Sequence, residues 1–366
     1  MKILVLTKRQ YMNKDLIDDR FGRFREIPLA LAQKGHKVQG LCLSYSDKKE
    51  GLFQDELVAW HSINATFMKL PGLLRFIRTA RSYAMKSDVM WACSDSFFGV
   101  IGCILGRLFK VPVIFDIYDN FAEFFVAKLP IMKQLYHWAI RESDAITCLS
   151  IPFTKLIKEK YGRTKHVYPI EFAVRNDLFK PFNKMHCRET FGLPRDAFIV
   201  GTAGGLFKNR DVHLLIETFM KLREKYYHLH LALAGSLDKN LQIPIDDRVH
   251  YLGILPFDKV PLFINSLDIA VICYADDEFG KYCFPQKTRE FMACDVPIVA
   301  AEVGSLKLLF RNHPEWLYKA GDVKSLSEVL EGRFSDRITD YPPIPTWEDL
   351  AVILEEIMLK VSYEEK

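Results

Sequence analysis

The chain has 366 residues, of which 49% are hydrophobic and 26% charged, and its formal net charge is +4. This length suits two α/β domains, the composition excludes a disordered chain, and the mild charge does not call for a nucleic-acid partner. The eight cysteines form no C-x-x-C pair and show no Cys/His ligand spacing, so we read them as reduced core residues of a cytoplasmic protein.

The first half of the chain alternates between short apolar runs and segments with helical spacing. This alternation predicts an α/β architecture with a parallel, doubly wound sheet. The N-terminal apolar run is too short for a signal peptide, and residues 96–109 contain Arg107 and are too short to span a membrane. The predicted strands are residues 2–7, 38–43, 88–92, 111–115, 145–150 and 166–170, and predicted helices begin at Arg23, 70, 97 and 151.

Charged residues stand at two places where loops meet these elements. Arg20 and two further arginines lie near the start of the first helix, where they indicate either a bound anionic group or a solvated basic helix start. Asp116, Asp119 and Glu123 follow the strand at 111–115. Open α/β sheets place ligand groups where strands end, so these carboxylates are candidates for binding acceptor hydroxyl groups. The alternative is that Asp119 caps the following helix.

The segment Leu70–Lys86 reads as a basic amphipathic helix. Its apolar stripe predicts packing on a sheet with solvated arginines, and peripheral contact with an anionic membrane at its inner face is the alternative. The stripe consists of Leu70, Leu73, Leu74, Ile77, Ala80 and Ala84, and the flanking basic residues are Arg75, Arg78, Arg81 and Lys86.

A glycine turn follows the first predicted strand of the second half, residues 198–203. Gly204 and Gly205 let the backbone approach a phosphate closely, and the next helix, which begins at residue 211, adds positive potential at its N-terminus. Lys208 and Arg210 supply cations in the same turn. A plain tight turn is the alternative. Further strands are expected at residues 229–234, 249–252 and 268–273, and further helices at 256–267 and 322–330.

Residues 284–301, FPQKTREFMACDVPIVAA, form a helix–strand unit. Pro285 suits the first turn of a helix that ends near Cys294, and the apolar run at 296–301 predicts a buried parallel strand. Lys287 and Glu290 fall on one helix face. One interpretation is that they only pair with each other on the helix face. The other is that the N-terminus of this helix, with these residues, binds an anion.

This unit resembles the nucleotide-sugar-binding signature of retaining GT-B glycosyltransferases, especially those similar to glycosyltransferase family 4. The matching pattern is P-x-K-x-x-E-[FY]-M-A-x-x-x-P-[IV]-[VI]-A, and every fixed position is present, from Pro285 to Ala300. The resemblance implies the GT-B fold, in which two Rossmann-like domains face a cleft. It also implies transfer of a sugar from a nucleotide-diphosphate sugar, with retention, to a glycan or lipid-linked acceptor in bacterial-type polysaccharide or glycolipid assembly.

The resemblance assigns roles to the residues of the second half. Lys287, Arg210 and the glycine turn would hold the diphosphate, and Glu290 would accept hydroxyl protons from the ribose. Gly205 stands where the family carries an arginine. The remaining donor-site candidates are Lys208, Phe284, Pro285, and either Glu278 or Tyr282, which are the two candidates for facing the transferred sugar.

Cofactor and domain expectations follow from the same resemblance. The sequence contains no D-x-D, so a metal-independent site is expected, with the nucleotide sugar as a substrate and no cofactor. The predicted domains are residues 1–170 on the acceptor side, a hinge at 171–182, a nucleotide-sugar domain at 183–340 and a terminal helix at 341–366 that packs back on the first domain.

Two other function classes stay open. A non-hydrolysing sugar-nucleotide epimerase would share this architecture and need no second substrate. A non-catalytic partner subunit would bind the nucleotide without transferring a sugar, and the departures at Gly205 and Tyr282 fit such a role. An oxidoreductase is the least favoured class, because no G-x-G-x-x-G follows the first strand.

Overall fold

In the computed structural model, the chain is described except for residues 12–13, 66–69, 121–129 and 364–366. It divides into two compact units. Unit 1 comprises Met1–Glu171 together with Trp347–Lys366, and unit 2 comprises Phe172–Thr346. The division therefore falls at residues 171 and 347, and the segment expected as a hinge belongs to unit 2 from Phe172 onward.

Unit 1 is built on an eight-stranded sheet with the strand order β10-β9-β8-β7-β1-β4-β6-β5. All its strand pairs are parallel except β5 with β6. The central strands are buried on both faces, as their nearly continuous apolar runs require. The strands are β1 (Lys2–Lys8), β4 (Lys37–Ser44), β5 (Gly51–Asp55), β6 (Val58–Asn64), β7 (Val89–Ala92), β8 (Val113–Ile117), β9 (Ala145–Cys148) and β10 (Val167–Pro169).

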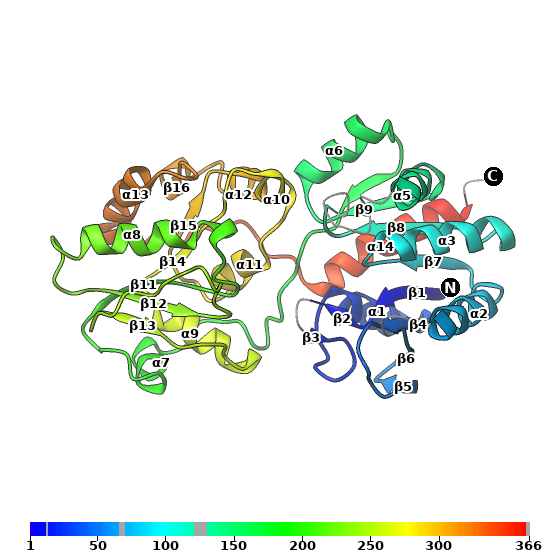
Figure 1. Cartoon of the computed structure of the whole chain (residues 1–366), viewed down its shortest axis with the longest axis horizontal. Helices are drawn as coiled ribbons and strands as arrows, with labels where there is room; N and C mark the ends of the chain where they lie inside the picture. The colour runs from blue at the N-terminus through cyan, green and yellow to red at the C-terminus, as the bar shows by residue number, and fades with distance from the viewer. Residues whose placement is uncertain (12–13, 66–69, 121–129, 364–366) are drawn as a thin grey trace. The chain divides into compact units, whose positions relative to one another are not determined.

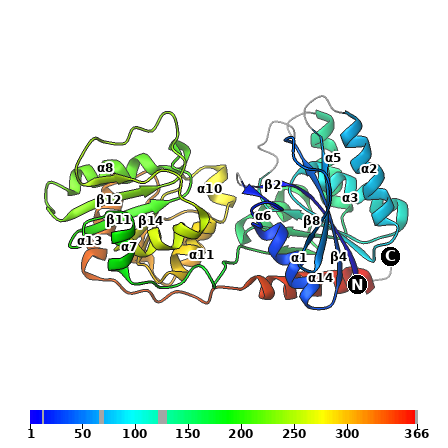
Figure 2. The ribbon, with the colours of Figure 1, turned by 90° about the horizontal axis from the view of Figure 1, so that it is seen from below.

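Helices cover both faces of this sheet. Figure 2 shows α1 and α14 on one side of it and α2, α3 and α5 on the other. A small antiparallel pair, β2 (Gln10–Tyr11) with β3 (Lys14–Asp15), follows β1. The helices of unit 1 are α1 (Arg23–Gln33), α2 (Leu70–Ala84), α3 (Ser96–Phe109), α5 (Pro130–Glu142), α6 (Ile151–Tyr161) and α14 (Trp347–Tyr363).

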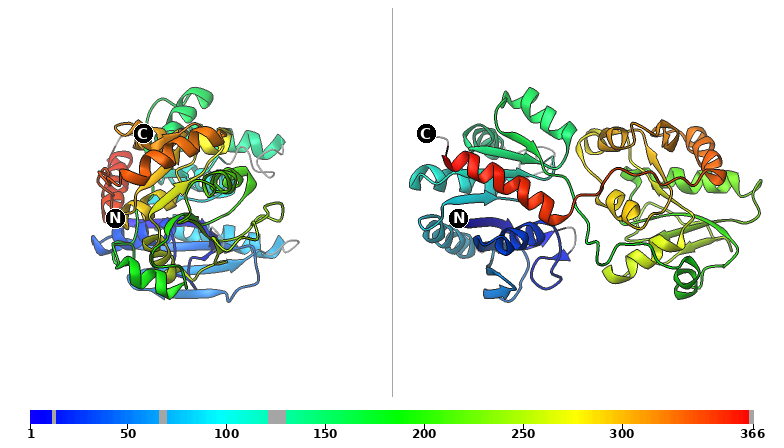
Figure 3. Two further views of the ribbon diagram at one scale, coloured as in Figure 1. Left: turned by 90° about the vertical axis from the view of Figure 1, so that its left-hand side faces the viewer. Right: turned by 180° about the vertical axis from the view of Figure 1, so that it is seen from behind.

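The last helix, α14, lies along α1 in unit 1, where it appears in red in the back view of Figure 3. Its apolar face, from Leu350 to Val361, is buried. Glu355 fixes the helix by accepting from Lys34 Nζ at 3.1 Å and meeting His36 Nε2 at 2.6 Å. Burial of this face against α1 explains why the C-terminal segment returns to the unit that contains the N-terminus.

Unit 2 contains a six-stranded sheet in which every strand pair is parallel, with the order β13-β12-β11-β14-β15-β16. Both units therefore confirm the α/β fold class predicted from the strand–helix alternation. The strands of unit 2 are β11 (Phe198–Ala203), β12 (Leu229–Ala234), β13 (Val249–Tyr251), β14 (Ile269–Ile272), β15 (Ile298–Ala301) and β16 (Leu317–Tyr318).

The connections of unit 2 are mostly short helices, labelled in Figure 1. Helix η2 follows the glycine turn after β11, and α11 follows the short helix α10 after β14. The helices are α7 (Lys184–Thr190), η2 (Lys208–Arg210), α8 (Val212–Leu222), η3 (Phe257–Lys259), α9 (Val260–Ser266), α10 (Glu278–Tyr282), α11 (Gln286–Ala293), α12 (Gly304–Leu309), η4 (Pro314–Trp316) and α13 (Val323–Ser335).

Two features of unit 1 differ from the expectations. The β5–β6 hairpin was not predicted, because the short edge strand β5, GLFQD, is largely exposed and lacks the alternation of apolar and polar residues that indicates a strand. The apolar stripe of α2 was wrong in part: Leu70 and Leu74 are 68% and 47% exposed. Phe76 lies at the centre of the buried face instead, because Gly72 packs so closely on the chain that a β-carbon there would lie 2.0 Å from the Asn64 carbonyl oxygen.

Candidate functional site

The strand order of unit 2 reverses between β11 and β14, which are neighbours in the sheet. From β11 the chain continues through β12 and β13 on one side and returns to β14 on the other. Ligands of open α/β sheets bind beside the carboxyl ends of the strands at such a switch point. The glycine turn follows β11 and the segment leading to α11 follows β14, so the topology brings together the two stretches that carry the candidate donor-site residues.

Lys287 is the buried cation of this switch point. Its side chain lies in the first turn of α11, two residues after the N-cap residue Pro285, and is 8% exposed. The Nζ atom donates to Thr202 Oγ1 at the end of β11, at 3.5 Å. Within the described part of the chain, no carboxylate forms an ion pair with it at 4 Å or less. A buried ammonium without an anionic partner is unfavourable, so this position favours an incoming anion.

The pKa of Lys287 reflects this burial of a positive charge. Burial and, to a smaller extent, the positive charge of Arg210 lower its pKa from 10.5 to about 8, while Glu290 acts in the opposite direction. A bound anion would stabilise the protonated form and raise the pKa again. The lysine is therefore poised to be charged in a liganded site.

Arg210 is held in place by aromatic rings. Its guanidinium carbon lies 5.4 Å from the centroid of Phe207 and 5.7 Å from those of Tyr274 and Phe279. Tyr274 and Phe279, which follow β14, stack on each other at 5.9 Å. Stacking orients the planar guanidinium and leaves its N–H groups at the edge able to donate. Sequence reasoning missed both rings, because nothing local in residues 274–279 points to the turn after β11.

The glycine turn itself is shaped by two close approaches. Gly204 has φ +101°, and a β-carbon on Gly235 would lie 1.6 Å from the Gly204 carbonyl oxygen. At Gly205 a β-carbon would lie 2.4 Å from the Phe207 ring, which explains why the expected arginine is absent there. The Gly204 N–H donates to the Ala234 carbonyl at 2.9 Å. The Gly205 N–H, in contrast, has no hydrogen-bond partner among the described residues.

Glu290 lies one turn after Lys287 on α11 and is half-buried. Burial raises its pKa from 4.5 to about 7, against the opposing effects of a hydrogen bond from Gln286 and the charge of Lys287. Gln286 Nε2 donates to Glu290 Oε1 at 3.1 Å. The carboxyl group is thus oriented and can gain or lose a proton near neutral pH, which suits a group that binds hydroxyls.

The other donor-site candidates occupy different environments. Lys208 is exposed, and Glu278 is exposed in the first turn of α10. Tyr282 is half-buried at the end of that helix. Phe284 is buried, with the guanidinium of Arg289 4.9 Å from its ring. The structure therefore brings Lys287, Arg210, Glu290 and the glycine turn to one switch point and gives Phe284 a packing contact within unit 2.

On unit 1, the predicted acceptor carboxylates have diverse surroundings. Asp116 is fully buried on β8, where it pairs with Arg23 Nη2 at 3.0 Å and accepts from Thr147 Oγ1 at 2.6 Å. Burial raises its pKa despite these two partners. Asp119 is half-buried and accepts from the Asn120 N–H at 2.7 Å. Glu123 lies outside the described residues.

The basic start of α1 is neither solvated nor open. Arg23 and Arg25 are both buried, and Arg25 pairs with Asp55 through its Nε at 2.7 Å. Arg20 is exposed and lies 3.7 Å from the same aspartate. Arg23 and Arg25 are thus buried, ion-paired residues of unit 1, so the expectation of a solvated basic helix start was wrong for these two.

The switch point of unit 1, between β1 and β7, carries a polar cluster that sequence reasoning missed. Lys8 Nζ donates to Asp95 Oδ1 at 3.1 Å and to the Tyr118 hydroxyl at 2.7 Å. Beneath it, the hydroxyls of Thr7 and Ser94 hydrogen-bond to each other. Lys8 at the end of β1 and Asp95 after β7 are both at the carboxyl edge of parallel strands, and this register is the signal that could have found them.

Comparison with known proteins places these features in context. Residues 197–336, which lie within unit 2, match the protein family described as Glycosyl transferases group 1. The capsular polysaccharide biosynthesis glycosyltransferase CapM of Staphylococcus aureus is 25% identical over 197 residues, which cover 50% of this chain and 50% of CapM. The chain thus spans about half the length of the curated relatives it matches.

Solved structures match over nearly the whole chain. Sucrose-phosphate synthase from Thermosynechococcus elongatus has a TM-score of 0.71 at 15% identity, covering 98% of this chain and 97% of that one. HepE of Anabaena, in complex with UDP and glucose, has a TM-score of 0.69 at 17% identity, covering 99% and 97%. These neighbours are GT-B glycosyltransferases, and they confirm the predicted GT-B fold class with its two Rossmann-like domains.

No helix in the described ranges is both long and apolar enough to cross a bilayer. In the same ranges, no three histidine, cysteine, aspartate or glutamate side chains lie together in a way that could hold a metal ion.

Proposed function

We propose that this protein is a glycosyltransferase that moves a sugar from a nucleotide-diphosphate sugar to a glycan or lipid-linked acceptor. The observation that carries the proposal is the buried ammonium of Lys287 at the β11–β14 switch point, within the residues that match the group 1 family, where no described carboxylate forms an ion pair with it. Departure of a nucleoside diphosphate develops negative charge that a fixed cation in a site of low polarity stabilises strongly. The same charge would relieve the unfavourable burial of Lys287.

The diphosphate would be shared among three groups. Lys287 provides a point charge, Arg210 a planar donor held by aromatic rings, and the Gly205 N–H a backbone donor. Glu290, one helical turn from Lys287, would accept hydroxyl protons of the ribose. Glu278 and Tyr282 on α10 remain the two candidates for contacting the transferred sugar. Lys208, which is exposed, would add positive charge at the edge of the donor site.

We further propose that the enzyme belongs with glycosyltransferase family 4, retains the anomeric configuration and needs no metal. The full match to the P-x-K-x-x-E signature supports the first point, and the cations already placed for the leaving group support the last. In this mechanism no side chain forms a covalent intermediate. A phosphate oxygen of the departing diphosphate takes the proton of the acceptor hydroxyl as the new bond forms on the same face of the sugar.

The acceptor side is assigned to unit 1. The Lys8–Asp95–Tyr118 cluster and Asp119 offer a cation, carboxylates and a phenol at or near the strand ends, a set that suits hydroxyl recognition. Capsular polysaccharide assembly by CapM and the name of a second relative, the putative teichuronic acid biosynthesis glycosyltransferase TuaH of Bacillus subtilis, support an acceptor in polysaccharide assembly. Peripheral membrane contact through α2, whose Leu70 and Leu74 are exposed, would suit a lipid-linked acceptor.

A two-stage experiment tests the proposal. Thermal shift with UDP, GDP and ADP identifies the base, since a ligand that binds the folded state raises the melting temperature. The matching nucleotide sugar is then incubated with the protein, first alone and then with extracts containing lipid-linked glycans. Transfer to an acceptor supports the proposal. Epimerisation of the sugar without an acceptor would replace it with the epimerase, and binding without turnover would replace it with a non-catalytic subunit.

A further inference from the structure

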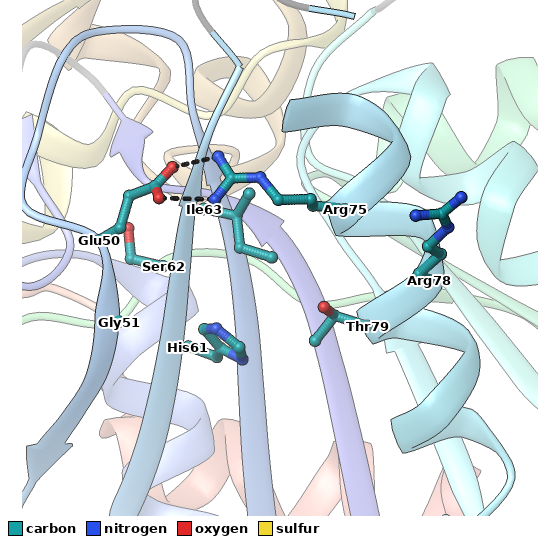
Figure 4. A pocket seen from close by; sticks show the side chains of 8 residues that line it. All are labelled: Glu50, Gly51, His61, Ser62, Ile63, Arg75, Arg78 and Thr79. Carbon is teal, nitrogen blue, oxygen red and sulfur yellow. Dashed lines mark hydrogen bonds and ion pairs between the residues drawn. The ribbon is translucent and has the colours of Figure 1, made fainter. Parts of the chain in front are cut away.

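Unit 1 contains a groove of about 430 Å³ between the β5–β6 hairpin and α2, away from the polar cluster at the ends of β1 and β7. Figure 4 shows Glu50 and His61 on the strand side and Arg75 and Thr79 on the helix side, with Arg75 reaching across. Arg78 stands at the rim, apart from the Glu50–Arg75 pair. We propose that this groove binds a phosphate group, carried either by a soluble phosphate ester or by a lipid headgroup.

The Arg75–Glu50 pair is pre-organised but has donors to spare. Arg75 Nη1 and Nη2 donate to the two carboxylate oxygens of Glu50 at 2.9 and 2.8 Å. Glu50 is itself positioned by the Asn64 N–H at 2.7 Å. An exposed pair of this kind contributes little to stability, so a ligand can replace it at small cost. A guanidinium has five N–H groups and Glu50 uses two, so a phosphate can bind to the others or displace the carboxylate.

Arg78 and Thr79 complete the helix side. They follow Arg75 at i+3 and i+4, so all three lie on adjoining positions of the same helix surface. In the described ranges neither the Arg78 guanidinium nor the Thr79 hydroxyl has a hydrogen-bond partner. This is unusual for the threonine, because helical hydroxyls commonly bond to a carbonyl one turn back, as Thr190 and Ser327 do at 2.9 Å.

His61 lies on the strand side of the groove and is half-buried. Its Nδ1 meets the Tyr83 hydroxyl at 3.0 Å, which leaves Nε2 without a partner among the described residues. Burial lowers the pKa of His61, and the charge of Glu50 opposes this effect. With the imidazole neutral, the formal charges of Arg75, Arg78 and Glu50 sum to one positive charge, which selects an anion. A bound phosphate would raise the pKa of His61, so protonation of His61 and phosphate binding should favour each other.

The exposed leucines of α2 separate the two sources of the phosphate. Leu74 directly precedes Arg75, and Leu70 lies one turn further toward the start of the helix; they are 47% and 68% exposed. A lipid whose headgroup binds in the groove would place its acyl chains against these leucines. A soluble phosphate ester would make no contact with them. A variant at Leu74 therefore distinguishes the sources without touching the phosphate-binding groups.

The test follows His61 directly, so that phosphate bound at the Lys287 site does not interfere. The full chain is labelled with 13C at its ten histidines, the His61 ring signal is assigned with His61→Gln, and inorganic phosphate or glycerol 3-phosphate is added at pH 6.5 against a chloride control. We expect the His61 signal to move and Arg78→Ala to weaken the apparent affinity about tenfold. The matched control is Arg81→Ala, an exposed arginine of the same helix that faces the Phe109 ring outside the groove.

The second arm uses vesicles of phosphatidylcholine with and without phosphatidylglycerol in a co-sedimentation assay. Binding to the anionic vesicles that falls with both Arg78→Ala and Leu74→Ser assigns the phosphate to a lipid headgroup. A His61 response to glycerol 3-phosphate without vesicle binding assigns it to a soluble ester. The proposal would be overturned if the His61 signal did not move in millimolar phosphate. It would also be overturned if Arg78→Ala and Arg81→Ala weakened the apparent phosphate affinity equally. Nucleotide binding measured on the same samples reports separately on the donor site.

Discussion

Replacing Lys287 by methionine should stabilise the protein and weaken its proposed donor binding. Methionine keeps the length and apolar stem of the lysine but removes the buried charge. Burial lowers the pKa of Lys287 from 10.5 to about 8. Below pH 8 the ammonium is charged in both the folded and unfolded states, so the folded state carries the full penalty; this penalty disappears as the pH rises from 8 to 10.5, where the unfolded state binds more protons.

The size of the effect follows from that shift. A difference of 2.5 pKa units (10.5 − 8) at about 1.4 kcal/mol per unit corresponds to about 3 kcal/mol at pH 7, and it falls to about 2 kcal/mol at pH 9. We therefore expect Lys287→Met to raise the free energy of unfolding by up to that amount at pH 7, with a smaller gain at pH 9. A nucleoside diphosphate should bind about 100-fold more weakly, because a charge-assisted contact in a site of low polarity is lost.

Urea denaturation at pH 7 and pH 9, followed by circular dichroism, measures the stability of both proteins, and isothermal titration calorimetry measures nucleotide affinity. The matched control is Lys208→Met, which removes an exposed lysine of the glycine turn and should leave stability unchanged. If Lys287→Met lowered the stability at pH 7 and kept the nucleotide affinity, Lys287 would be a packing residue and the reasoning about its unpaired charge would be refuted.

Three further predictions concern neighbouring groups. The pKa of Glu290 is about 7, so nucleotide affinity should rise as the pH increases through 7 and the carboxylate forms; Glu290→Gln should flatten this calorimetric pH profile, and an unchanged profile would contradict the role. Gly205→Ala should destabilise unit 2 by about 1–3 kcal/mol in urea because of the Phe207 ring, whereas Gly332→Ala, where nothing lies within 4 Å, should not; equal effects would refute the packing argument. Asp116→Asn should lower the melting temperature by leaving Arg23 short of its buried carboxylate, a loss of about 3–5 kcal/mol, and lost transfer at full stability would instead indicate an acceptor contact.

Local patterns in the sequence identified most elements of the fold and the centre of the candidate site. Buried parallel strands such as β1 and β15 are continuous apolar runs. Pro285 indicates the start of helix α11, which ends close to Cys294 as predicted. The motif that contains Lys287 and Glu290 is contiguous, so its helix–strand context could be read directly. These features depend on backbone preferences and burial periodicity within a few residues, which a single sequence displays.

Only the tertiary structure decided which distant groups meet. The rings that hold Arg210, the Thr202 hydroxyl beside Lys287 and the Lys8–Asp95 pair join residues far apart in the chain. Asp116 looked like a ligand group from its position after a strand, but a buried arginine 93 residues away uses its carboxylate. Strand order and helix rotation set these contacts, and both are chosen by the packing of the entire unit. Local propensity does not contain this information. The sequence could therefore nominate Lys287 but could not reveal that no described carboxylate forms an ion pair with it.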